Sequence, residues 1–254
     1  MKSSRVNPLH TIRCPAEKSK DKATPRSHSK APRGTDQASR RGLGGQDGSE
    51  ALATSERLAY IWWVFAIHTS VMSEVVYYLP GWAGRLNTGL GQGLMDRGFD
   101  VSGRETRDEF RDLPFLEQVQ LVANDLQNYF WTPESKVVAN SFGAYLFLNT
   151  LPQLPPYVGK VLLLSPIIGT FEDETTARTF EPPYPERLKQ LLNEGKIPRP
   201  MNIEVHTGSE DWQSSPAGVT SFFSKLEVPV TIAEGRGHML GADYVGDLLD
   251  QWVK

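Results

Sequence analysis

Residues 137–144 read Val-Val-Ala-Asn-Ser-Phe-Gly-Ala, an apolar run followed by a serine that has small residues two positions before and after it. The apolar run predicts a buried strand, and the segment after Ser141 predicts a helix. A tight turn from strand to helix strains the central residue and brings neighbouring backbone close, so Ala139 and Gly143 fit such a turn. The turn would expose the Ser141 hydroxyl. A buried serine after a core strand is the alternative interpretation.

An acidic pair follows a second predicted strand. Residues 203–208 alternate between apolar and polar side chains like a strand. Ser-Glu-Asp-Trp comes directly after Gly208, so Glu210 and Asp211 are both candidates for a carboxylate at this strand end.

A histidine follows the last predicted strand, residues 228–233. It ends the run Glu-Gly-Arg-Gly-His, which places His238 on a glycine-rich turn. A serine hydroxyl is a weak nucleophile until an imidazole takes its proton and a carboxylate orients that imidazole. His206 would lie inside a strand, where a single histidine is usually a packed core residue, so we favour His238 as the base.

The order serine, acid, histidine, with each residue after a predicted strand, resembles the α/β-hydrolase family in its compact serine-hydrolase or esterase form. The resemblance covers residues 74–254. It implies that Ser141 is the nucleophile, that His238 is the base and that Asp211 orients His238. The family's spacing after the strand glycine favours Asp211 over Glu210, although a slip of one residue in the turn would exchange them.

Residues 75–84, Val-Val-Tyr-Tyr-Leu-Pro-Gly-Trp-Ala-Gly, are similar to the strand and the glycine-rich oxyanion loop of this family. Pro80 replaces the family's usual histidine, but the loop contributes a backbone N–H, which the replacement keeps. The resemblance implies that the N–H groups of Trp82 and Phe142 bind the oxyanion. Trp82, Phe142 and Trp212 would also line an apolar substrate pocket, and plain packing of these rings is the alternative.

Composition divides the chain into three segments. Residues 1–57 form a basic leader, whose first 54 residues carry 11 basic and 5 acidic side chains and so few apolar ones that we expect disorder. Residues 58–71 include a short apolar segment, which fits an interfacial anchor or a packed helix but is too short to span a bilayer. Residues 72–254 form the α/β-hydrolase domain. Because Met72 directly precedes the first predicted strand, we expect residues 1–71 to be an upstream extension without a part in the active site.

Strands alternate with helices along residues 72–254, which predicts a mostly parallel sheet of about six strands with helices on both faces. Its active site would lie at the carboxyl ends of the strands. This minimal form leaves no room for the first two antiparallel strands of larger family members. We expect strands near 74–79, 99–102, 136–140, 160–165, 203–207 and 229–233, and helices near 85–97, 113–130, 142–151, 184–194, 215–226 and 240–252.

Residues 166–200 form a connection between two core strands that is longer than usual. Members of the family that this chain resembles carry a lid in this connection, and a lid would exclude water and shape the pocket. A surface excursion with one helix fits the same residues.

Charge and cysteine content restrict the function. Residues 72–254 carry 15 basic and 24 acidic side chains, which argues against nucleic acid as a partner. The basic leader is either solvated or bound to an anionic surface. Cys14 is the only cysteine, which leaves no disulfide or cysteine metal site and fits a reducing, cytoplasmic location. The sequence has no metal-ligand cluster, phosphate loop, dinucleotide fingerprint, convincing signal peptide or transmembrane segment, so we expect no cofactor and no metal.

We therefore expect a serine hydrolase that cleaves a carboxylic ester or related small acyl compound through an acyl-serine intermediate. A thioesterase, amidase or lipase would use the same residues. A protein of this fold that only binds a partner would tolerate the loss of any of the three groups, and all three are present.

Overall fold

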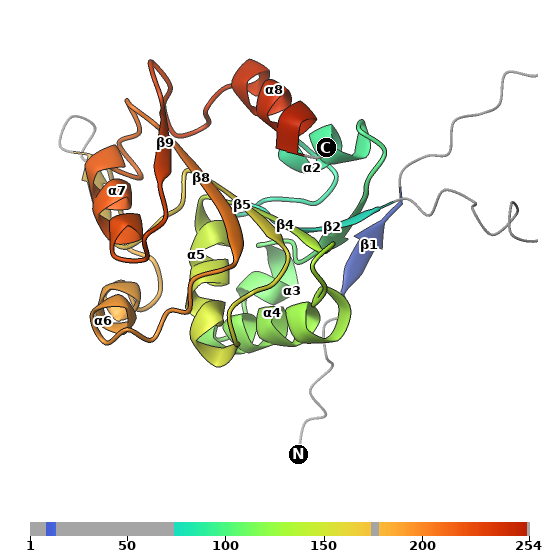
Figure 1. Ribbon diagram of the computed structural model, residues 1–254, viewed down its shortest axis with the longest axis horizontal. Helices are drawn as coiled ribbons and strands as arrows, with labels where there is room; N and C mark the ends of the chain where they lie inside the picture. Colours follow the sequence, from blue (N-terminus) through green and yellow to red (C-terminus); the bar gives the residue numbers. More distant parts are fainter. Residues whose placement is uncertain (1–8, 14–73, 174–177, 253–254) are drawn as a thin grey trace, which may run out of the picture. The chain divides into compact units, whose positions relative to one another are not determined.

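The computed structural model describes residues 9–13, 74–173 and 178–252 (Figure 1). The chain divides into two units, one of Met1–Cys14 with Ser73–Lys254 and one of Pro15–Met72. The second unit lies outside the described residues, and with it the apolar segment 58–71, His28, His68 and most of the expected leader.

A seven-stranded sheet forms the centre of the described unit, in the order β1-β3-β2-β4-β5-β8-β9. The six strands from β2 to β9 pair in parallel, and β1 pairs antiparallel with β3. These six match the predicted positions to within one residue at each end. The strands are β1 (His10–Ile12), β2 (Val75–Leu79), β3 (Asp100–Gly103), β4 (Lys136–Asn140), β5 (Lys160–Leu164), β8 (Asn202–Gly208) and β9 (Val230–Ala233).

Strand β1 adds a seventh strand to the six expected, and it comes from residues 10–12 of the expected leader. His10 pairs with Gly103 and Ile12 with Val101, and the Thr11 and Ser102 hydroxyls lie 3.0 Å apart. Three residues in a polar context have no periodicity that would predict a strand. They form one because the free edge of β3 supplies their hydrogen bonds. One antiparallel strand is therefore present after all.

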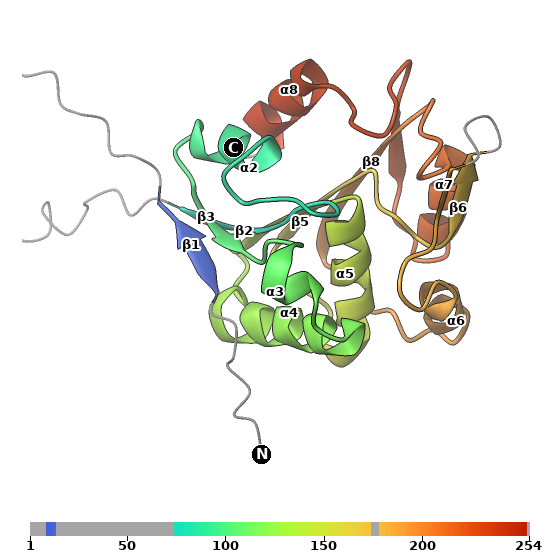
Figure 2. The same cartoon turned by 180° about the vertical axis from the view of Figure 1, so that it is seen from behind.

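Helices cover both faces of the sheet (Figures 1 and 2). Strand residues alternate between the two faces: Tyr77 and Val137 pack in the core under α3 to α7, whereas Tyr78 and Val138 pack in the core under α2 and α8. The helices are α2 (Leu90–Met95), α3 (Asp108–Arg111), α4 (Phe115–Tyr129), α5 (Phe142–Thr150), α6 (Arg187–Asn193), α7 (Pro216–Ser224) and α8 (Ala242–Trp252).

Helix α2 is shorter than the helix predicted near 85–97. It begins only at Leu90, after Gly89, whose φ of 53° and ψ of −119° are not helical. The chain also approaches itself here, because a Cβ on Gly91 would lie 1.9 Å from the Leu86 carbonyl oxygen. The segment before Leu90 is therefore a loop, which becomes important for the pocket below.

The long connection 166–200 contains a small two-stranded sheet and a helix. Strands β6 (Phe171–Asp173) and β7 (Arg178–Phe180) pair antiparallel, and α6 follows them. Its one helix agrees with the prediction near 184–194, whereas the strand pair was not predicted.

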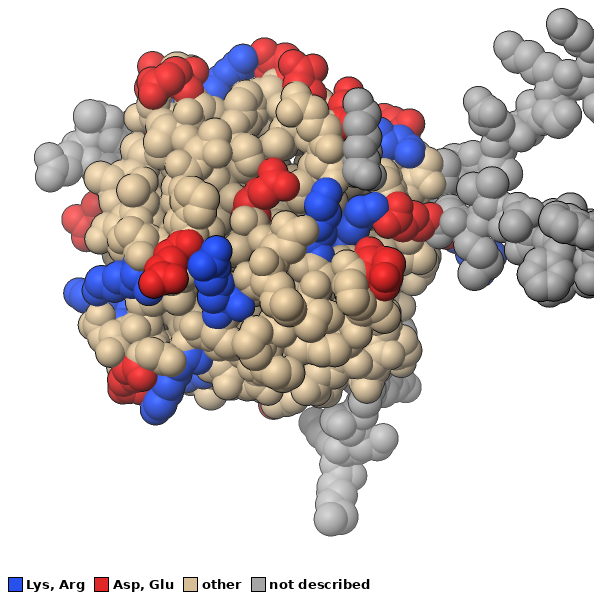
Figure 3. Space-filling view, in the orientation of Figure 1, with Lys and Arg blue, Asp and Glu red and all other residues tan. Residues whose placement is uncertain are grey.

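Charged side chains lie in small groups of mixed sign on the face shown in Figure 3. The excess of acidic residues in the domain thus does not form a single-sign patch on that face. Among the described residues, no helix has the length and apolar character needed to cross a membrane.

Candidate active site

Ser141 lies between β4 and α5, at the turn that the sequence predicts. Its φ of 52° and ψ of −118° are unusual for a residue with a side chain. Its N–H donates to the Leu164 carbonyl (2.9 Å), and its own carbonyl accepts from the N–H groups of Tyr145 and Ile167 (3.2 and 3.3 Å). Neighbouring backbone therefore holds the strained residue from several sides.

The small residues around Ser141 have the predicted steric role. A Cβ on Gly143 would lie 2.0 Å from the Leu79 carbonyl oxygen and 2.6 Å from that of Pro80. Ala139 is fully buried. The first turn of α5 thus packs directly on the end of β2, which brings Ser141 next to the loop that follows β2.

The loops after β8 and β9 are joined by backbone contacts. The N–H of Ser209 donates to the Ala233 carbonyl (3.0 Å), and that of Glu210 donates to the Arg236 carbonyl (2.9 Å). A Cβ on Gly208 would lie 2.0 Å from the same Arg236 oxygen, so the loops approach as closely as a glycine permits. Asp211 and His238 are therefore held side by side.

The three predicted residues form one continuous chain of hydrogen bonds. His238 Nε2 lies 2.9 Å from Ser141 Oγ. His238 Nδ1 lies 3.0 Å from each carboxylate oxygen of Asp211. With Nδ1 protonated, the ring donates to Asp211 and its Nε2 accepts from the serine hydroxyl, which is the orientation that proton removal from the hydroxyl requires.

Asp211 is a buried carboxylate whose oxygens are well provided with donors. Its side chain is fully buried, and Oδ1 accepts from the backbone N–H groups of Gln213 (3.0 Å) and Ser214 (2.8 Å). Oδ2 accepts from Thr207 Oγ1 (3.3 Å). Glu210, the competing acid, is exposed, so the contact with His238 is made by Asp211.

The loop after β2 passes alongside Ser141. A Cβ on Gly81 would lie 3.3 Å from Ser141 Cβ and 3.7 Å from its Oγ. Among the described residues, the N–H groups of Trp82 and Phe142 donate to no protein group. The two expected oxyanion donors are therefore free to bind a ligand.

Thr106, which the sequence analysis did not identify, holds this loop. Its hydroxyl donates to the Gly81 carbonyl and accepts from the Gly84 N–H (3.0 Å). Its carbonyl accepts from the N–H of Ala83 (3.1 Å), a residue with a φ of 57°. No sequence motif marks a buried threonine beyond the end of β3, so its part became visible only in the structure.

A pocket of about 650 Å³ opens beside Ser141 and His238. The loop after β2, helix α2 and the first part of α8 form most of its walls. Of the three aromatic residues expected to line a pocket, Trp82 lines this one, whereas Phe142 and Trp212 do not. Phe142 is buried because it begins α5, a helix whose residues are all buried.

Phe142 and Trp212 belong instead to a cluster of rings near the site. Trp82 packs edge-on against Phe142 (4.9 Å between ring centroids) and Phe180 (5.7 Å). Phe171 stacks on Phe180 (5.2 Å) and lies edge-on to Trp212 (5.6 Å). The β6–β7 strand pair is thus packed against the two tryptophans that flank Ser141 and Asp211.

The other candidate histidines lie elsewhere. His206 is buried in β8, with Nδ1 2.8 Å from the Tyr244 hydroxyl, and burial lowers its pKa. His10 lies in β1. No group of three or more His, Cys, Asp or Glu side chains suited to a metal ion occurs in the part of the chain that the structure describes.

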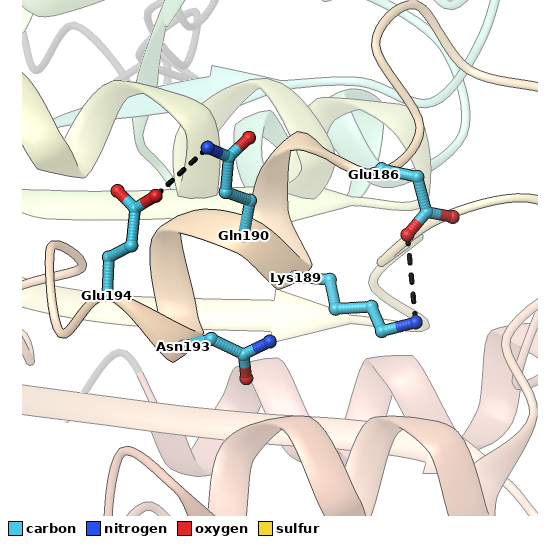
Figure 4. A pocket seen from close by; sticks show the side chains of 5 residues that line it. All are labelled: Glu186, Lys189, Gln190, Asn193 and Glu194. Carbon is cyan, nitrogen blue, oxygen red and sulfur yellow. Dashed lines mark hydrogen bonds and ion pairs between the residues drawn. The ribbon is translucent and has the colours of Figure 1, made fainter.

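A second hollow, of about 360 Å³, lies on the outer surface of α6 (Figure 4). Its lining is polar, with a Glu186–Lys189 ion pair (3.6 Å) and a hydrogen bond from Gln190 to Glu194 (2.9 Å). These contacts between residues three and four apart are ordinary on an exposed helix. The pocket beside Ser141 is the stronger candidate for a ligand.

No protein-family model and no curated protein matches this chain. Solved structures do match it. Est1E from Butyrivibrio proteoclasticus with ferulic acid bound has a TM-score of 0.51 and 11% identity over 73% of this chain and 92% of its own. TT1662 from Thermus thermophilus has a TM-score of 0.50 and 18% identity over 72% and 90%, and the ydeN gene product from B. subtilis has 0.50 and 14% over 71% and 98%. The parallel sheet, its turn at Ser141 and these likenesses agree: the chain has the compact α/β-hydrolase fold.

Proposed function

We propose that the protein is a serine hydrolase that cleaves a carboxylic ester or a related acyl compound. The observation that carries this proposal is the chain of hydrogen bonds from Ser141 Oγ through His238 to buried Asp211. It lies at the carboxyl edge of the sheet, beside a pocket large enough for a small molecule.

The proposed reaction has two halves. Ser141 Oγ attacks the carbonyl carbon while His238 Nε2 takes the hydroxyl proton, and the carbonyl oxygen becomes an oxyanion bound by the N–H groups of Trp82 and Phe142. His238 then gives its proton to the leaving alkoxide, which departs as alcohol. Water adds to the acyl-serine with His238 again as base, and the acid and free Ser141 result. Asp211 holds the imidazole and stabilises its charged form.

Labelling with a fluorophosphonate tests this proposal, because the probe forms a covalent bond with an activated serine. Wild type should be labelled, and Ser141→Ala should not be labelled while keeping its fold. A panel of p-nitrophenyl esters and acyl-thioesters, assayed on both proteins, would distinguish esterase from thioesterase activity. Equal labelling of the two proteins, or no labelling of wild type, would refute the assignment of Ser141.

A further inference from the structure

The walls of the pocket away from Ser141 come from α2 and α8, which pack on the same face of the sheet. Apolar side chains from α2, α8, the end of β5 and the segment before α8 line the pocket: Leu90, Val245, Leu249, Leu164 and Leu240. Among the described residues that line the pocket, none is acidic. The apolar side chains favour an apolar group where they line the pocket.

Arg97 joins the two helices at this end. Its Nη1 donates to the Gly93 carbonyl (2.8 Å), its Nη2 to the Gly246 carbonyl (2.9 Å) and its Nε to Asp250 (2.7 Å). Each of its three nitrogens therefore donates to a protein group, and its charge is paired with that of Asp250. Arg97 is therefore held in place as part of the pocket wall.

Close packing does not explain why two positions in these helices are glycine. A Cβ on Gly93 would meet Arg97 and Leu249 at 3.7 and 3.8 Å, and a Cβ on Gly246 would meet Arg97 at 3.5 Å. These are ordinary contacts, in contrast to Gly91, where a Cβ would lie 1.9 Å from a carbonyl oxygen. Neither residue has a positive φ.

A glycine inside a helix is less stable than an alanine at the same position. Gly93 and Gly246 both line the pocket, and the absence of side chains there leaves room at the end formed by α2 and α8. We propose that this end binds the apolar group of the ester substrate, and that Gly93 and Gly246 set the length of the group accepted. The inference rests on the proposed function and adds to it a substrate class, esters with an extended apolar group.

Chain-length profiles test the inference. We compare kcat/KM for p-nitrophenyl acetate, butyrate and octanoate in wild type, Gly93→Leu and Gly246→Leu. The leucine variants should lower the octanoate-to-acetate ratio by roughly 10-fold or more, since excluding a few methylenes from an apolar pocket has about this effect. Gln92→Leu is the matched control, because it adds the same side chain to an exposed position of α2, and it should leave the ratio unchanged.

A second series, acetate esters of butanol and octanol followed by acid release, distinguishes an acyl group from an alcohol group in this pocket. A shift in either series supports the inference and identifies the group. Unchanged ratios in both series, in variants that fluorophosphonate still labels, would overturn the inference and leave the proposed function standing. If the leucine variants do not fold, Gly93→Ala carries the test: it should reduce the ratio severalfold, and no change would overturn the inference. If wild type neither labels nor hydrolyses any ester, both proposals fail together.

Discussion

Replacing Thr106 by valine removes a hydroxyl that bridges two backbone groups of the loop beside Ser141. Valine keeps the size and the branching of the side chain, and Thr106 is almost fully buried, so no new cavity or exposed surface arises. The Gly81 carbonyl and the Gly84 N–H also bond each other at 2.9 Å, so neither group loses its last partner. We therefore expect the free energy of unfolding to fall by only about 1 kcal/mol.

Activity should fall much further than stability does. The loop carries the N–H of Trp82, which we propose binds the oxyanion, and complete loss of one such donor costs about 10²–10³ in kcat. A displaced donor should therefore cost roughly 10- to 100-fold in kcat. KM should change only a few-fold, because the oxyanion forms in the transition state and not in the bound ester.

Steady-state hydrolysis of p-nitrophenyl butyrate and urea unfolding measure the two effects separately. Thr106→Ser keeps the hydroxyl and should restore kcat to within a few-fold of wild type. Thr150→Val is a control for buried hydroxyl loss, because its Oγ1 donates to the Leu146 carbonyl (2.9 Å) at the far end of α5; it should lower stability without lowering kcat. A wild-type kcat in Thr106→Val would refute the idea that Thr106 positions the loop.

Three further predictions follow from the site and the core. Gly143→Ala would put a Cβ 2.0 Å from a carbonyl oxygen at the end of β2. The free energy of unfolding in urea should therefore fall by roughly several kcal/mol, and fluorophosphonate should label Ser141 slowly. Near-normal values would mean that α5 can move away from β2. Asp211→Asn should reduce kcat by roughly 10³–10⁴-fold in ester hydrolysis, whereas Glu210→Gln should have little effect; the reverse result would exchange the two acids. Burial raises the pKa of Tyr145 to about 12. Because unfolded tyrosine ionises near pH 10, stability from this group is complete below that pH and falls as the pH rises from about 10 to 12. Urea unfolding at pH 9 and 11 should show the loss, and Tyr145→Phe should reduce it; an equal loss in that variant would assign it to other groups.

The six parallel strands could be predicted because the buried ones read as apolar runs, such as β2, β4 and β5, and the others alternate or lie between turn residues. The positions of Asp211 and His238 followed from the same reasoning, since the residues after parallel strands meet at one edge of the sheet. Strand β1 could not be predicted, because its hydrogen bonds depend on an edge formed by residues about ninety positions away. Thr106 and the pocket walls likewise depend on contacts between distant segments.

The difference between the predicted and the observed start of α2 has a local cause. Gly89 and Gly91 interrupt a segment whose apolar spacing resembles a helix, and the approach of Leu86 to Gly91 forms a loop there. The prediction that Phe142 lines the pocket differs from the structure for a related reason. Phe142 follows Ser141 in the sequence, but this does not show where its side chain points. Its ring is buried with the rest of α5.

Gly89 and Ser141 adopt almost the same backbone angles, with φ and ψ of 53° and −119° at one and 52° and −118° at the other. Each precedes the first residue of a helix. Gly89 has no side chain and adopts these angles freely, whereas at Ser141 they cost of order 1–3 kcal/mol. The backbone angles alone would favour glycine at both places. The serine at 141 is therefore kept against a local energetic preference, and this is what a proposed nucleophile that must project its hydroxyl toward His238 requires.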